Sequence, residues 1–147
     1  MLASSVADDK AILVGAAALS PVTDLTLSGV TYETRAEADP YFTKQQVAEL
    51  VHAYLGSVDP SDPRASPLHG RLSGLPPIHI HAGDDEVLLD DSRRYAERAM
   101  AAGVDARLDV WAGMPHGFAA IIGPLKASAQ ALDAIGTFLT DRFGGRN

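Results

Sequence analysis

The sequence has no cysteine among its 147 residues. Disulfide bonds, thiolate zinc sites, iron–sulfur clusters and cysteine nucleophiles are therefore excluded for this chain, because each of them needs a cysteine sulfur. The absence of cysteine leaves the redox compartment open.

Long apolar runs and positive charge are also scarce. No run approaches the roughly 18 apolar residues that cross a bilayer; the longest, residues 11–19, is interrupted by Gly15. Twelve Lys and Arg against nineteen Asp and Glu give a net charge of −7, which leaves no basic face for a phosphate backbone or an anionic membrane. Residues 1–10 lack the basic start and apolar stretch of a secretory signal. We therefore expect no nucleic-acid or membrane partner and a cytoplasmic location.

The order of the predicted elements indicates one α/β domain. The run of apolar residues at 11–19, with Gly15 inside it, is typical of a strand covered on both faces, and further strands are predicted at 78–82 and 106–111. Thr43 and Gln46 form a capping box that begins a helix ended by Gly56. Two more helices are predicted at 88–102 and 125–142. Strands that alternate with helices favour a parallel sheet with right-handed crossovers and helices on its faces.

Candidate catalytic residues follow the strands, because ligands meet the carboxyl ends of the strands in open parallel sheets. Residues 83–86, Gly-Asp-Asp-Glu, follow the second strand, and His116 follows the third. A carboxylate beside an imidazole can orient the ring and stabilise its protonated form, as acid–base catalysis requires. The alternative from spacing alone is that the acids cap a helix and that His116 is an ordinary loop residue.

Two segments resemble a known family. Residues 83–91, GDDEVLLDD, and 111–118, WAGMPHGF, are similar to the C-terminal half of the hormone-sensitive-lipase-like branch of α/β hydrolases. Segments 20–25, 38–40, 66–68 and 73–77 match the family in the same order, and the resemblance extends over residues 15–143. Val22 departs from the pattern, because the family commonly has an aromatic residue there.

The resemblance implies a fold, an activity and two site residues. The fold would be a partial α/β-hydrolase fold with a short parallel sheet of about three strands and flanking helices. The activity would be that of a carboxylesterase that cleaves short acyl esters without a cofactor or a metal. By their places in the family motifs, Asp85 would be the acid of the catalytic triad and His116 its base.

The nucleophile of such an enzyme is missing from the sequence. A serine hydrolase places its serine in a Gly-x-Ser-x-Gly turn and takes oxyanion donors from that turn and from an upstream glycine-rich loop. None of the ten serines has glycines two places before and two places after it. In the family both motifs precede the strand predicted at 11–19. We therefore expect a segment unlike the family at 1–10, a C-terminal hydrolase half at 11–143, a tail at 144–147, and weak or no activity of the chain alone.

The first predicted strand would have an unpaired, apolar edge, which proteins normally cover or pair. A second copy of the chain, a separate N-terminal half, or residues 1–10 could cover this edge. We favour a homodimer, because a twofold contact lets identical apolar patches cover one another.

Two other functions remain open. His79 and His81 alternate along one strand and share a face, a spacing that can place two imidazoles on a metal in a metallohydrolase, although a third ligand is needed. The chain could also be a non-catalytic relic or interaction module, because a fold can survive the loss of its function.

Overall fold

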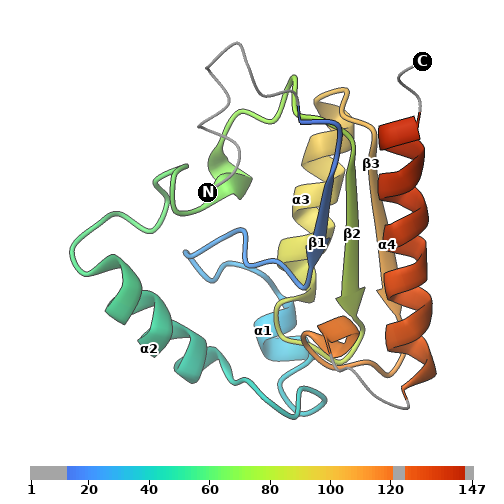
Figure 1. The fold of residues 1–147 in the computed structure, drawn as a ribbon. Helices are drawn as coiled ribbons and strands as arrows, with labels where there is room; N and C mark the ends of the chain where they lie inside the picture. The colour runs from blue at the N-terminus through green and yellow to red at the C-terminus, as the bar shows by residue number, and fades with distance from the viewer. Residues whose placement is uncertain (1–12, 121–124, 145–147) are drawn as a thin grey trace.

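The computed structural model of the chain describes residues 13–120 and 125–144 (Figure 1). The predictions for residues 1–10, for the first two positions of the strand predicted at 11–19, and for residues 145–147 of the tail lie outside the described residues.

Three parallel strands form the sheet in chain order, as predicted: β1 (Ala16–Leu19), β2 (Ile78–Gly83) and β3 (Ala106–Trp111). β1 begins later than predicted. Its first ladder hydrogen bond runs from the amide of Ala16 to the carbonyl of Pro77, at 2.8 Å. Because Pro76 and Pro77 have no amide N–H to donate, β2 begins only after them, and the pairing of β1 begins there too.

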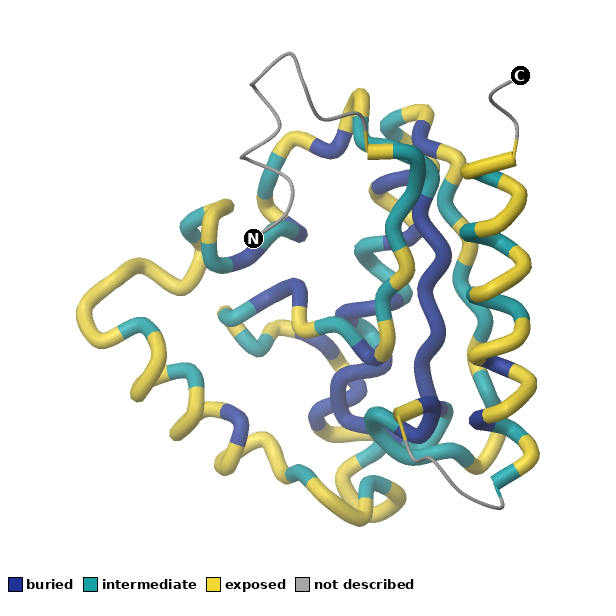
Figure 2. The backbone as a smooth tube through the Cα atoms, in the orientation of Figure 1, coloured by how far each residue is buried: buried dark blue, intermediate teal, exposed yellow. Residues whose placement is uncertain are grey.

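Two long helices cover opposite faces of the sheet (Figure 1). Successive side chains of a strand point to opposite faces. Ile78 and Ile80 pack in the core cluster with residues of α3 (Leu89–Ala101), whereas the ring of His79 contacts Phe138 of α4 (Lys126–Gly144). β2 is therefore enclosed on both faces and buried along its whole length (Figure 2).

The segment between β1 and β2 carries the remaining helical elements. The capping box of Thr43 and Gln46 is present as predicted, and it begins α2 (Lys44–Leu55), which ends at Gly56. A four-residue helix that the sequence did not predict, α1 (Thr31–Thr34), lies in the loop after β1. Short 3₁₀ turns follow at η1 (Pro67–His69) and, after β3, at η2 (Phe118–Ala120). No helix among the described residues has the length and apolar character to span a bilayer.

A buried carboxylate joins the end of β1 to α3. The Oδ2 atom of Asp91 accepts hydrogen bonds from the amides of Thr23 and Asp24, at 2.7 and 2.8 Å. Burial raises the pKa of Asp91 to about 6, although the two amide donors oppose that shift. The segment that leaves β1 is therefore attached to α3 by main-chain hydrogen bonds to one buried side chain.

The pKa of the neighbouring carboxyl, that of Asp24, is shifted in the opposite direction. Burial alone would raise its pKa, but hydrogen bonds from Ser28, Thr26 and His69 hold that pKa far below its usual range. Arg94 of α3 also donates a hydrogen bond to Asp24, at 2.9 Å. Asp24 is therefore a charged anchor between the loop after β1 and α3.

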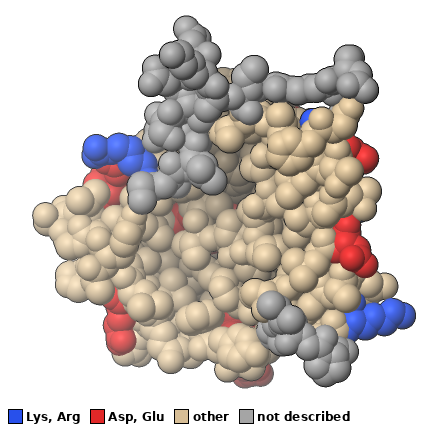
Figure 3. Space-filling model, viewed as in Figure 1, with Lys and Arg blue, Asp and Glu red and all other residues tan. Residues whose placement is uncertain are grey.

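The outer side of β1 is open among the described residues. β1 lies at one end of the strand order, and Ala17 and Leu19 are exposed on it. Figure 3 shows that the face of the molecule viewed in Figure 1 carries few charged side chains, which lie mainly at its margins.

Candidate active site

His116 is paired with a buried glutamate. The Nδ1 atom of His116 lies 3.0 Å from Oε2 of Glu86. The side chain of Glu86 is 0% exposed, whereas that of His116 is 26% exposed. A carboxylate that accepts from Nδ1–H leaves Nε2 as the unprotonated nitrogen of the neutral ring. The pair therefore consists of an enclosed acid and an imidazole with one nitrogen free for proton transfer.

Asp85, the predicted acid, is near His116 but is not its partner. The amide of Asp85 donates to the carbonyl of Met114 at 3.0 Å, so the two loops are neighbours at one sheet edge, as predicted. The carboxylate of Asp85 has no hydrogen bond to another described side chain, and Asp84 forms an ion pair with Arg35 at 2.9 Å. The hydrogen-bond partner of His116 is therefore Glu86 and not the predicted Asp85, whose amide is bound to the neighbouring loop.

The loop that carries His116 rests directly on the end of β2. A Cβ atom at Gly83 would lie 2.0 Å from the carbonyl oxygen of Met114, so only glycine fits there. On the far side of the loop, the amide of Gly117 donates to Oγ of Ser20, at 3.1 Å. The ends of β1 and β2 therefore both contact the loop of His116.

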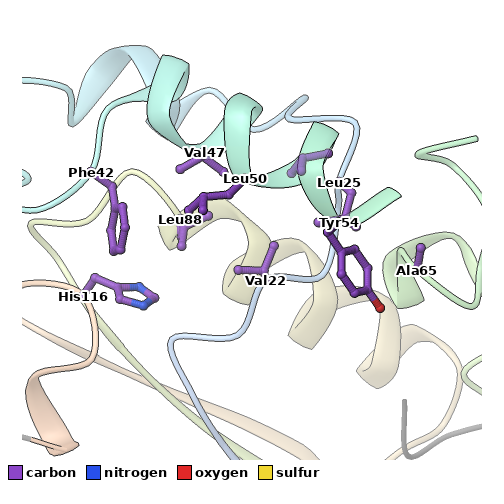
Figure 4. A pocket seen from close by; sticks show the side chains of 10 residues that line it. Val22, Leu25, Phe42, Val47, Leu50, Tyr54, Ala65, Leu88 and His116 are labelled. Atoms are coloured by element: carbon purple, nitrogen blue, oxygen red, sulfur yellow. The ribbon is translucent and has the colours of Figure 1, made fainter. Parts of the chain in front are cut away.

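An apolar cavity opens beside His116. It has a volume of about 360 Å³ and lies between α2 and the body of the domain. Figure 4 shows the ring of His116 at one end of the cavity and Tyr54 towards the other. The ring of Phe42 meets that of His116 edge to face, with centroids 5.2 Å apart. The cavity is lined by Val22, Leu25, Phe42, Val47, Leu50, Val51, Tyr54, Ala65, Leu88 and His116.

Asp39 connects this cavity to the turn that carries the buried acid. Its Oδ1 atom accepts from the amides of Tyr41 and Phe42, at 2.8 and 3.0 Å. Its Oδ2 atom accepts from the amide of Val87, at 2.8 Å, directly after Glu86. One carboxylate therefore holds both the backbone at Phe42 and the turn after β2.

The histidines of the metal hypothesis lie elsewhere, on the α4 face of β2. Their candidate ligand atoms and that of Asp109 lie within 4.8 Å of one another, so Asp109 is a third candidate ligand. The indole of Trp111 donates to Nδ1 of His81 at 3.0 Å, which leaves the proton of the neutral ring on Nε2.

This hydrogen bonding does not fit a metal site. A metal ligand must present a lone pair, but Nδ1 of His81 is occupied by Trp111 and Nε2 is protonated. Asp109 already binds His79 at 2.9 Å and Arg107 at 3.0 Å. Burial, followed by the charge of His79, lowers the pKa of His81 to about 4, as expected for a neutral ring that accepts from an indole. The residues form a packed polar cluster under α4.

Comparisons with known proteins decide the family. The profile of a family described as "alpha/beta hydrolase fold" matches residues 1–120. The chain belongs to the α/β-hydrolase family. It is 33% identical over 129 residues to an acetyl-hydrolase of Streptomyces hygroscopicus, a match that covers 88% of this chain and 43% of that protein. It is 34% identical over 123 residues to an esterase of Acinetobacter venetianus, covering 83% of this chain and 41% of that protein.

Solved structures agree with this assignment. The fold matches that of an esterase from the bacterial hormone-sensitive lipase family with a TM-score of 0.88 and 40% identity. That match covers 91% of this α/β hydrolase and 45% of the esterase chain. The resemblance to the C-terminal half of such an enzyme is therefore confirmed, and the chain spans less than half the length of the relatives it matches.

Proposed function

We propose that the chain supplies the acid–base part of a serine carboxylesterase site, with His116 as general base and Glu86 as the acid that orients it. The observation that carries the proposal is the hydrogen bond between Nδ1 of His116 and the fully buried Oε2 of Glu86, 3.0 Å long. Membership of the α/β-hydrolase family, with an acetyl-hydrolase and esterases among the relatives, supports ester hydrolysis as the reaction class.

The geometry supports a defined role for each group. Glu86 accepts from Nδ1–H and so keeps the lone pair of His116 on Nε2, from which the ring can take a proton from a hydroxyl nucleophile. When the ring becomes protonated, the buried carboxylate stabilises its charge at close range. The same ring can then return the proton to the departing alcohol.

The nucleophile and the oxyanion donors would come from a polypeptide segment beyond the described residues. No described serine forms a hydrogen bond with His116. We therefore expect the chain by itself to hydrolyse esters weakly or not at all, because one missing oxyanion donor alone costs about 10²–10³ in turnover.

The cavity favours short apolar substrates. Its walls are mainly aliphatic and aromatic, and His116 closes one end, where the ester bond would lie. A volume of about 360 Å³ is at the small end of ligand-binding pockets. We propose that a short acyl or alkyl group of the ester occupies this cavity.

The first experiment measures the chain itself. Hydrolysis of p-nitrophenyl acetate should be very slow, and a fluorophosphonate probe should label no serine, because no activated nucleophile is present. Turnover comparable to that of a complete esterase, with the probe mapped to one of the ten serines, would contradict the proposal.

The second experiment joins this chain to a segment from a relative. A chimera joins the unmatched N-terminal part of the Streptomyces hygroscopicus acetyl-hydrolase to this chain, which replaces the matched 129 residues. The soluble, folded chimera should hydrolyse p-nitrophenyl acetate. His116→Ala and Glu86→Gln should each lower kcat by about 10²–10⁴-fold. Asp85→Asn is the matched control and should retain most of the activity; the reverse result would restore Asp85 as the acid.

A further inference from the structure

Ser20 has an uncommon backbone conformation at the carboxyl end of β1. Its φ is +43°, in the left-handed region that residues other than glycine rarely adopt. Ser20 is buried, and its amide donates to the carbonyl of His81 at 2.8 Å. Pairing with β2 therefore holds this residue in a conformation that costs free energy.

The hydroxyl of Ser20 is turned towards the loop of the proposed base. Its Oγ atom accepts the hydrogen bond from the amide of Gly117, at 3.1 Å. Gly117 follows His116 directly and itself has a φ of +67°, so its backbone turns sharply at that point. The bond crosses 97 residues of sequence and attaches the His116 loop to a strand that is not its own.

Glycine would be the least strained residue at a φ of +43°, yet serine is present. Alanine would keep the strain and lose the acceptor, and glycine would remove both. What serine adds at this position is therefore its hydroxyl oxygen, and the described contact of that oxygen is with the His116 loop.

We propose that Ser20 is a positioning residue for His116. By holding the amide of Gly117 it fixes the loop so that Nδ1 of His116 faces Glu86. This inference rests on the proposed function of the His116–Glu86 pair. Ser20 acts through the loop and is not itself assigned a catalytic step.

The test uses NMR to compare the full chain with three variants at Ser20. Ser20→Ala removes the acceptor, Ser20→Gly removes the acceptor and the strain, and Ser20→Asn offers an amide oxygen on a residue that tolerates positive φ. Hydrogen exchange of the Gly117 amide reports the bond itself. The low-field resonance of the Nδ1 proton of His116 reports its bond with Glu86.

In both Ser20→Ala and Ser20→Gly, exchange of the Gly117 amide should be about tenfold faster, and the Nδ1 resonance should broaden or disappear. Ser20→Asn should restore part of the protection. The thermal midpoint of Ser20→Gly should be at least as high as that of Ser20→Ala, since strain is relieved. Ser20→Gly therefore separates loop positioning from overall stability, and it is the deciding variant if Ser20→Ala does not fold.

Ser66→Ala is the matched control. Ser66 is also buried and its Oγ accepts a backbone hydrogen bond, from Leu25 at 2.7 Å. This variant should lose stability without changing the Gly117 exchange or the Nδ1 resonance. Unchanged exchange and an intact resonance in Ser20→Gly would overturn the inference. These readouts do not involve hydrolysis. An inactive chimera would therefore contradict the proposed function, whereas the NMR measurements on the Ser20 variants test the role of Ser20 separately.

Discussion

Gly83 and Met114 lie so close together that no side chain fits between them. A Cβ atom at Gly83 would be 2.0 Å from the carbonyl oxygen of Met114 and 2.8 Å from that of Pro115. Because both atoms belong to the backbone, neither can turn away as the end of a side chain can. The last residue of β2 must therefore be glycine because of the space available to it, and not because of its backbone angles.

Gly83→Ala should displace the His116 loop. We expect the free energy of unfolding to fall by about 1–3 kcal/mol, as overpacking typically does, and the low-field Nδ1 resonance of His116 to be lost. Denaturation in urea and NMR measure the two effects. Gly136→Ala, within α4, is the control, because a Cβ atom at this position would meet no heavy atom within 4 Å. This variant should raise the free energy of unfolding by about 0.5–1 kcal/mol. Equal stability of Gly83→Ala and the parent would refute the steric argument.

The contribution of Asp91 to stability should be larger in mild acid than at neutral pH. Burial raises its pKa in the folded state to about 6, from an ordinary value of 3.8. Its contribution is therefore fully present below about pH 4 and is lost as the pH rises through 6, on the order of 2 kcal/mol. Asp91→Asn keeps an oxygen for the amides of Thr23 and Asp24 but does not titrate. The difference in urea stability between parent and variant should change across pH 4–7; parallel profiles would contradict the assignment.

His81 should have the opposite effect in the same pH range. Its folded-state pKa is lowered by burial to about 4, from 6.5, so its contribution is present above about pH 6.5 and is lost as the pH falls through 4. In His81→Gln, which keeps an acceptor for Trp111, stability should decrease more from pH 4 to 7 than in the parent. The parent should therefore show a flatter profile than either variant. A His81→Gln profile that rises with pH relative to the parent would show the sign to be wrong.

The homodimer expected from the sequence stays a prediction. Within residues 13–120 and 125–144 nothing pairs with the outer side of β1, and the face shown in Figure 3 carries few charged side chains. Both observations favour self-association, and we expect a dimer at micromolar concentration by light scattering. Leu19→Lys should produce a monomer by placing charge at this edge. Val110→Lys, at a similarly exposed position of β3, should leave the dimer intact. A parent that is monomeric at every concentration would remove the prediction.

Elements with strong local signals were predictable from the sequence. The capping box at Thr43 and the glycine at position 56 define α2, and β3 has the predicted bounds. α1 was missed because it is only four residues long and its N-cap has no side-chain hydrogen bond. The start of β1 was misplaced because it depends on where its partner begins, which is information from outside the strand.

The sequence located the candidate site to within one residue of the observed hydrogen-bond partner of His116. Strand order and family resemblance located His116 and the acidic turn, because the carboxyl ends of parallel strands share an edge. They could not choose among three consecutive acids, since that choice depends on the path of the turn. Arg35 binds Asp84, and the amide of Asp85 is bound to the neighbouring loop, which leaves Glu86 directed inward. The contact of Ser20 with the His116 loop had no sequence signal, because its partner Gly117 is 97 residues away.

The double attachment of Asp39 has a consequence for any attempt to change substrate preference. Its two carboxylate oxygens bind the amide of Phe42, at the cavity wall, and the amide of Val87, beside the buried acid. A substitution that moves Phe42 to admit a larger substrate pulls on the same carboxylate that anchors the acidic turn. Under the proposed function, the shape of the cavity and the position of the acidic turn should therefore change together, and variants selected for bulky esters should acquire compensating changes at or around position 39.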